Sequence, residues 1–223
     1  MIFFSMGEVN FNTIIRLADK YFSTIPAIIH SCSREKPPLT QPRLLEKKKK
    51  THQTHLLTGG QAYDMYDTKR IPLFLLNNVL GGPGMNSRLN VSLREKHGLV
   101  YHVESNIASY TDTGLFTIYL GTDPKNKDQV IQLVNNELTK LCKNRLNELQ
   151  LSKAKKQIFG QMVLSNENKE GVFLGLGKSF LHYNRYDTLP EVFQKIERVT
   201  PQQLQETANE VFEPTRLFCL VFE

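Results

Sequence analysis

The feature that most constrains the fold is a hairpin pattern in the middle of the chain, directly followed by helical patterns. Residues 99–109 and 114–121 have the composition of strands, and residues 111–114 (Thr-Asp-Thr-Gly) between them are typical of a tight turn. Asp123-Pro124 then predicts the start of a long helix, because the carboxylate can accept from free backbone N–H groups and proline fits the first turn. A sheet must bury one of its faces, so we expect the helices to cover it.

The other patterns complete a fold of the α+β class, with one mixed, mainly antiparallel sheet covered by helices on one face. The helix expected over residues 86–97 has Met85, Leu89 and Leu93 as its predicted buried face. Further helices are predicted at residues 10–23, 69–80, 151–167, 170–183, 189–198 and 201–211, and further strands at residues 1–6, 51–59 and 216–222.

Composition excludes several classes of protein. Hydrophobic residues make up 40% of the chain and charged residues 22%, which is the range of globular proteins and not of disordered, collagen-like or disulfide-scaffold chains. No apolar stretch reaches the 18 or more residues of a membrane helix, so we expect no membrane partner.

The basic charge of the chain is concentrated in one segment. The net charge is +6, and residues 34–50 alone hold seven basic and two acidic side chains. We interpret residues 33–50, which contain several prolines, as an exposed basic connector and expect no nucleic-acid partner. The alternative is that this segment makes the chain a basic binding module.

The cysteines are consistent with a reducing compartment. Cys32, Cys142 and Cys219 are far apart and form no Cys-x-x-Cys pair, which predicts buried free thiols. No targeting signal is recognised, and a cytoplasmic location is slightly favoured.

Three motifs suggest chemistry but lack what that chemistry requires. Residues 171–179 miss the phosphate-loop pattern because Val172 replaces a glycine, and a single Asp112-Thr113-Gly114 lacks the second carboxylate of an aspartic peptidase. His52-x-x-His55 has no acidic neighbour of the kind that a zinc site needs. We therefore predict no metal ligand and no catalytic residue in this chain.

Residues 80–124 contain several motifs in a specific order. These are Leu80-Gly81-Gly82, Ser87-Arg88-Leu89, Arg94-Glu95-x-x-Gly98-Leu99-x-Tyr101, Asp112-Thr113-Gly114-Leu115-Phe116 and Gly121-Thr122-Asp123-Pro124. With these motifs in this order, the chain resembles the C-terminal, non-zinc-binding domain of the insulinase/pitrilysin family of zinc metallopeptidases, which are also called inverted zincins. Within that family it is similar to the processing peptidases. The helical residues before Phe22 and after Lys153 also fit, so the resemblance covers essentially the whole chain.

The resemblance implies that residues 1–223 are a single C-terminal domain, a fragment of a longer two-domain protein. The chain has no H-x-x-E-H motif, and a catalytic zinc needs three protein ligands and a general base. The implied partners are a homologous H-x-x-E-H domain, in the same chain or a separate subunit, and a peptide substrate. Zinc is expected in the partner domain, and this chain alone is expected to be inactive and able to form a homodimer.

The resemblance assigns substrate binding to two residues of this half. Arg94 and Tyr101 match an arginine and a tyrosine that reach the active site of the partner domain and bind the substrate near its scissile carbonyl. From spacing alone, Arg94 could instead pair with Glu95 or Glu104, and Tyr101 could be a core residue in phase with Val103. The resemblance favours substrate binding.

The glycines that follow Leu80 have two interpretations. Gly81, Gly82 and Gly84 either end one helix and allow the next to begin, or form a flexible substrate-entry loop. For the protein as a whole, the alternative to a peptidase half is a noncatalytic assembly or scaffold protein of the same fold.

Overall fold

The computed structural model describes residues 2–26, 34–38, 41–49 and 51–223, which group into two compact units. Unit 1 comprises the described residues up to Arg34 together with residues 160–192, and unit 2 comprises residues 35–159 and 193–223. Cys32 and part of the 33–50 connector lie outside the described residues.

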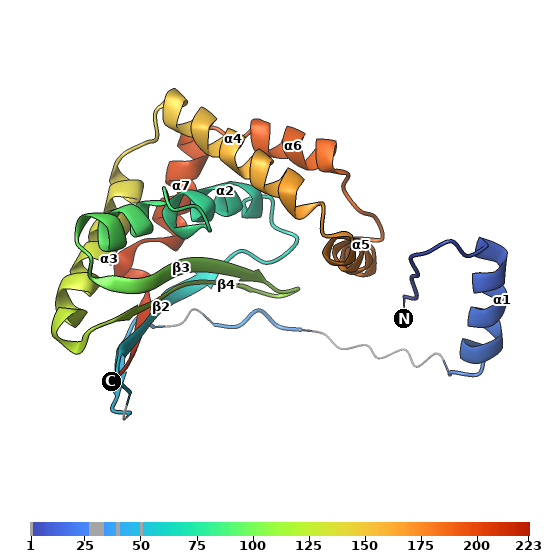
Figure 1. The fold of residues 1–223 in the computed structure, drawn as a ribbon, viewed down its shortest axis with the longest axis horizontal. Helices are drawn as coiled ribbons and strands as arrows, with labels where there is room; N and C mark the ends of the chain where they lie inside the picture. The colour runs from blue at the N-terminus through green and yellow to red at the C-terminus, as the bar shows by residue number, and fades with distance from the viewer. Residues whose placement is uncertain (1, 27–33, 39–40, 50) are drawn as a thin grey trace. The chain divides into compact units, whose positions relative to one another are not determined.

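Unit 2 contains a five-stranded mixed sheet (Figure 1). Its spatial order is β1-β5-β2-β4-β3, and only the β1–β5 pair is parallel. The strands are β1 (Leu44–Lys47), β2 (Thr54–Ala62), β3 (Val100–Ser109), β4 (Gly114–Thr122) and β5 (Phe218–Phe222). The predicted α+β class with a mainly antiparallel sheet is confirmed, and the central hairpin is β3–β4.

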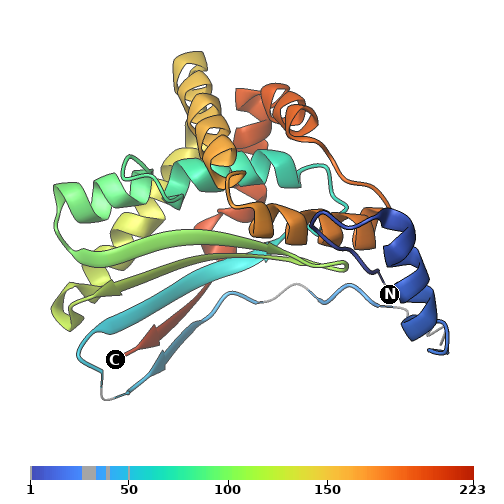
Figure 2. The ribbon, with the colours of Figure 1, turned by 45° about the vertical axis from the view of Figure 1, so that its right-hand side comes forward.

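Helices of unit 2 lie on one face of this sheet (Figures 1 and 2). Helix α2 (Arg70–Gly81) packs on β3, α7 (Pro201–Val211) packs on β2, and α3 (Lys127–Lys143) packs against α7. Between these layers Phe116 of β4 and Phe212 are both fully buried, with ring centroids 4.4 Å apart. The one-sided cover follows from strand alternation, since Phe116, Ile118 and Leu120 point to the helices.

The remaining helices connect or belong to unit 1. Helix α4 (Glu148–Ser165) and helix α6 (Leu189–Glu197) begin or end in unit 2, while α1 (Phe11–Phe22) and α5 (Lys169–Tyr183) lie within unit 1. None of the helices in the described ranges combines the length and apolar character needed to cross a membrane.

The predicted strand at residues 1–6 is wrong for residues 2–6, which are irregular and mostly exposed. Phe3 instead packs on Phe22 with ring centroids 5.7 Å apart, and Phe4 packs edge-on against Phe173 of α5 at 4.8 Å. An apolar run of this length can serve helix contacts as well as a sheet, which is why its pattern was ambiguous.

The start of the long helix also differs from its prediction. Asp123 makes no side-chain hydrogen bond to the helix start, where residues 124–126 form a short 3-10 turn before α3. The Asp123 carboxylate accepts a hydrogen bond from Tyr101 instead.

The edge strand β1 is held in three ways. Its backbone pairs with β5 from Leu44 to Lys47, and flanking hydrogen bonds join Cys219 N to Arg43 O and Glu223 N to Lys47 O. Lys127 of α3 adds ion pairs to Glu46 at 3.2 Å and to Glu223 at 2.8 Å.

Two cysteines have the predicted free thiols. Cys142 is buried in α3, where its Sγ donates to the carbonyl of Ala208 at 3.3 Å. Burial raises the pKa of the Cys142 thiol to about 11. Cys219 on β5 is only half-buried.

A polar cluster fixes the chain after β2 to α7. Tyr63 Oη donates to Glu210 Oε2 at 2.6 Å, and Lys69 Nζ donates to Glu210 Oε1 at the same distance. Partial burial of Glu210 would raise the pKa of its carboxyl group, but the bonds from Lys69 and Tyr63 outweigh this and lower the pKa.

Because the folded-state pKa of Glu210 lies below its unfolded value of about 4.3, its stabilisation is complete above that value and disappears as the pH falls through the folded pKa. We expect Glu210→Gln to lower the free energy of unfolding at pH 7 by about 1 kcal/mol. The difference from wild type should vanish in acid, as measured by urea unfolding between pH 7 and pH 3. Glu206→Gln, on the same helix, is the control and should show no such convergence.

Helix α2 ends where it approaches β3 closely. Gly81 is buried, and a Cβ atom there would lie 2.7 Å from Ser105 Oγ and 2.9 Å from the Ser105 backbone nitrogen. Neither atom is free to move away, because Ser105 belongs to a paired strand and its hydroxyl donates to the Asn77 carbonyl.

We therefore expect Gly81→Ala to destabilise the protein by about 1–3 kcal/mol, as overpacking does. Gly160→Ala is the matched control, because Gly160 lies inside α4 and a Cβ there meets nothing within 4 Å. In that variant the free energy of unfolding should rise by about 0.5–1 kcal/mol, because alanine favours a helix more than glycine does. Urea midpoints moving in the same direction would contradict the packing role of Gly81.

Candidate functional site

The element that carries Arg94 is a wide helical turn, not the regular helix predicted for residues 86–97. Residues Asn90–Lys96 form a π-helix, η1, whose buried residues include Leu93. Leu89 is also fully buried, but Met85 is 65% exposed, so the prediction of Met85 as a core residue is wrong. π-helical turns are rare and are frequent at functional sites.

A glycine closes η1 and turns the chain into β3. Gly98 has φ +61°, a left-handed conformation that favours glycine, and its N–H donates to the Arg94 carbonyl at 3.0 Å. The Leu99 N–H donates to the Leu93 carbonyl at 2.9 Å. These two bonds fix Arg94 in the last turn before the strand.

Arg94 is exposed on this turn. Among the described residues its guanidinium has neither an ion pair nor a side-chain hydrogen bond, so the sequence-based pairings with Glu95 and Glu104 are not formed. Glu104 Oε2 lies instead 3.3 Å from His102 Nε2. The guanidinium is therefore free to bind a ligand.

The turn η1 packs against α3, and Arg88 precedes it. Arg88 is half-buried, and burial lowers the pKa of its guanidinium, an effect opposed by the nearby Glu137 carboxylate. Glu137 is only 8% exposed and accepts a hydrogen bond from Lys140 at 2.6 Å.

A β-bulge determines where Tyr101 points. Val100 pairs with Thr122 and His102 pairs with Gly121, so Tyr101 is the extra residue of β3. A bulge breaks the in–out alternation of a strand. Val103 consequently faces the core, while Tyr101 is 59% exposed and is not the core residue that simple alternation with Val103 would make it.

The hydroxyl of Tyr101 is tied to the end of β4. Tyr101 Oη donates to Asp123 Oδ1 at 3.0 Å. This hydrogen bond, together with the negative charge of the carboxylate, raises the pKa of the Tyr101 phenol. The phenol therefore remains protonated at neutral pH. Sequence spacing gave no sign of this partnership, which arises from the pairing of β3 with β4.

The glycines of the predicted loop lie at the end of α2 and beyond it. Gly81 and Gly82 are buried, and a Cβ on Gly82 would lie 2.7 Å from the Asn78 carbonyl oxygen. Gly84 is half-buried beside Asn86 and Gln157. Close packing thus accounts for Gly81 and Gly82, whereas the mobility of the loop stays a prediction.

A second group of polar side chains, not anticipated from the sequence, lies on the sheet face opposite the helices. His55 Nδ1 is 2.9 Å from Tyr119 Oη, and the two rings are stacked. His102 pairs with Gly121 across β4 from His55, so the two histidines belong to one row of the sheet. Only strand register, which the sequence does not reveal, brings them together.

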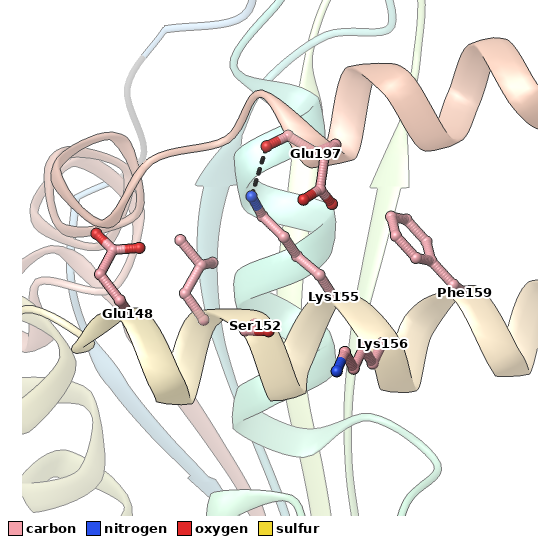
Figure 3. Close-up of a pocket in the computed structure, with 7 residues that line it drawn as sticks. Glu148, Ser152, Lys155, Lys156, Phe159 and Glu197 are labelled. Carbon is pink, nitrogen blue, oxygen red and sulfur yellow. Dashed lines mark hydrogen bonds between the residues drawn. The ribbon is translucent and has the colours of Figure 1, made fainter.

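A pocket of about 360 Å³ lies between α4 and the end of α6 (Figure 3). Its lining residues are Glu148, Leu151, Ser152, Lys155, Lys156, Phe159 and Glu197. Lys155 is only 8% exposed, and its Nζ donates to the backbone carbonyl of Glu197 at 2.5 Å. A lysine at this position satisfies a free carbonyl at a helix C-terminus, which is a structural role.

The residues that the structure describes do not fit a zinc site. The sequence lacks H-x-x-E-H, and within the described ranges no three His, Cys, Asp or Glu side chains gather closely enough to hold a metal ion.

The sequence matches the family model described as the peptidase M16 inactive domain over residues 1–158. The chain belongs to this family of zinc-protease domains, as the motifs around Arg94 and Tyr101 indicated.

Relatives and solved structures agree with this assignment. The chain is 30% identical over 210 residues to YmxG of Bacillus subtilis, named as an uncharacterized zinc protease, and the match covers 94% of this chain and 51% of YmxG. An uncharacterized zinc protease of Streptomyces coelicolor is 28% identical, with 92% and 46% covered. The chain thus spans about half the length of these relatives.

The crystal structure of a peptidase M16 inactive domain from Pseudomonas fluorescens has the same fold, with a TM-score of 0.83 and 22% identity over 97% of this chain and 52% of that one. A protease from Helicobacter pylori gives a TM-score of 0.79 at 21% identity, with 96% and 53% covered.

The structural role of Lys155 can be tested against its neighbour. We expect Lys155→Met, which keeps the apolar stem and removes the ammonium group, to lower the free energy of unfolding by about 1–3 kcal/mol. Lys156→Met should change it by less than about 0.5 kcal/mol, because Lys156 is exposed. Urea unfolding followed by circular dichroism measures both, and equal losses would rule out the assigned role.

Proposed function

We propose that this chain is the substrate-binding, non-metal half of a zinc-dependent metalloendopeptidase. The observation that carries the proposal is the pair of exposed donors at the junction of η1 and β3. Arg94 has no acidic partner among the described residues, and the bulge turns Tyr101 out of the core. Membership of the M16 family and the half-length match to proteins named zinc proteases support it.

The two side chains suit a peptide carbonyl on which negative charge develops. A guanidinium is a permanent cation with several N–H donors, and a phenol with a raised pKa keeps its proton. Donors aimed at developing charge stabilise a transition state more than the ground state. In the resting state the Tyr101 proton is directed at Asp123, so donation to a substrate oxygen requires the phenol to exchange one acceptor for the other.

The zinc and the general base would come from a homologous H-x-x-E-H domain, on the same polypeptide or a second subunit. When bound there, zinc would activate the attacking water. The residues of this chain would bind and orient the peptide, with the loop at Gly81, Gly82 and Gly84 admitting it. By itself, this chain would hydrolyse no peptide.

The alternative is a noncatalytic assembly protein. A chain of the Candida albicans Complex III2 structure shares the fold, with a TM-score of 0.70 at 14% identity over 83% of this chain. The two proposals differ in whether Arg94 and Tyr101 affect turnover.

We expect Arg94→Ala and Tyr101→Phe each to reduce kcat by about 10²–10³, the usual cost of losing one donor to a developing oxyanion. The measurement is hydrolysis of an unfolded peptide by the protein assembled with its zinc-binding half. Lys96→Ala, two residues after Arg94 on the same turn, and Tyr110→Phe, at the opposite end of β3 from Tyr101, are controls, because both residues are exposed and Tyr110 lies away from the proposed site.

Wild-type kcat in both the Arg94 and the Tyr101 variant would reject the substrate-binding role and favour the assembly protein. Hydrolysis by this chain alone that persists after zinc is removed with a chelator would reject the dependence on a partner domain.

A further inference from the structure

Helix α1 presents an apolar face that the described residues leave open. Its twelve residues include none that is buried. Phe11 is 72% exposed, Tyr21 62% and Ile15 51%, and the preceding Met6 and Val9 are exposed to a similar degree. Five large apolar side chains of α1 are exposed, and no twelve-residue segment in the described part of residues 34–223 has as many.

The apolar residues of α1 form one continuous stripe. At 100° per residue they fall within less than half of the helix circumference, and the polar residues occupy the opposite side. The stripe consists of Phe11, Ile14, Ile15, Leu17, Ala18, Tyr21 and Phe22, and the polar side consists of Asn12, Thr13, Arg16, Asp19 and Lys20.

A helix with this pattern depends on packing. Isolated helices shorter than about 12–15 residues are marginal in water, and an amphipathic face normally supplies most of the stability. The Asn10 side chain caps α1 by accepting from the Asn12 N–H at 2.9 Å, and Phe3 covers part of Phe22. Within unit 1 these contacts leave Phe11, Ile15 and Tyr21 exposed, so the helix requires a further surface.

The relatives are long enough to contain a further domain. The first two relatives match this chain over only 51% and 46% of their own length, so a region as long as this chain lies outside the match. The same holds for the Pseudomonas fluorescens structure, of which 52% is covered. A region of that size forms a domain with its own core, which can bury a helix stripe.

We propose that the apolar stripe of α1 docks on the homologous zinc-binding half, so that residues 11–22 fasten the two halves together. This inference rests on the partner half named in the proposed function. The stripe faces the partner, and Arg16, Asp19 and Lys20 remain in water on the opposite side.

The test places the photo-crosslinking residue benzoylphenylalanine at Phe11 or at Tyr21 in the protein assembled with its zinc-binding half. The expected result is a crosslink from both positions to peptides of the domain that carries H-x-x-E-H, identified by mass spectrometry. The control position is Arg16, at the centre of the polar side, where this crosslink should be lost.

Crosslinks to residues 35–223 of this chain, crosslinks to a second copy of it, or no crosslink would each overturn the proposal. So would equal crosslinking from Arg16. A second variant, Phe11→Ser with Tyr21→Ser, should keep the melting temperature of the chain alone and, in a pull-down with the two halves expressed as separate polypeptides, no longer retain the zinc-binding half. Neither readout uses activity, so wild-type turnover in the Arg94 and Tyr101 variants would reject the proposed function without altering these results.

Discussion

The pairing of β3 with β4 is the constraint on which the rest of the structure depends. It places Phe116, Ile118 and Leu120 on the helix side of the sheet, where α2 and α7 bury them. The same pairing contains the bulge that exposes Tyr101 at the end of the hairpin where Asp123 lies. A strand without the bulge would keep strict alternation and could not direct Tyr101 outward while Val103 stays in the core.

The fold was predictable from the sequence wherever the apolar residues follow one clear period, either that of a strand or that of a helix. The hairpin, α2 and α7 have clear two-residue or helical periods and lie within a few residues of their predicted ranges, and α3 begins a few residues after its predicted start. Residues 2–6 and Asp123 were predicted wrongly because their local chemistry suits two structures. An apolar run serves a strand or a helix contact, and an aspartate before a helix can accept from the backbone or from a phenol.

The candidate site was predictable only through its motif. Spacing alone left Arg94 between a surface ion pair and a ligand contact, and left Tyr101 between a core residue and a ligand contact. The exposure of both side chains depends on tertiary structure, namely a π-helical turn closed by Gly98 and a one-residue bulge. Neither feature has a reliable signature in a single sequence. The π-helical turn changes the number of residues per turn, and the bulge adds one residue to one strand of a pair. Apart from the closing glycine, neither change requires an unusual residue.

The parallel edge pair has a mechanical consequence. The basic connector of residues 33–50 contains β1 (Leu44–Lys47), which pairs along its length with β5 and joins the connector to the sheet. Tension applied along the connector therefore loads these backbone bonds in shear, so that they resist together and do not open one after another. Lys127 reinforces the same joint by binding both strands from α3. Tension along the connector therefore acts first on the edge of the sheet that lies farthest from β3, the strand that carries Tyr101.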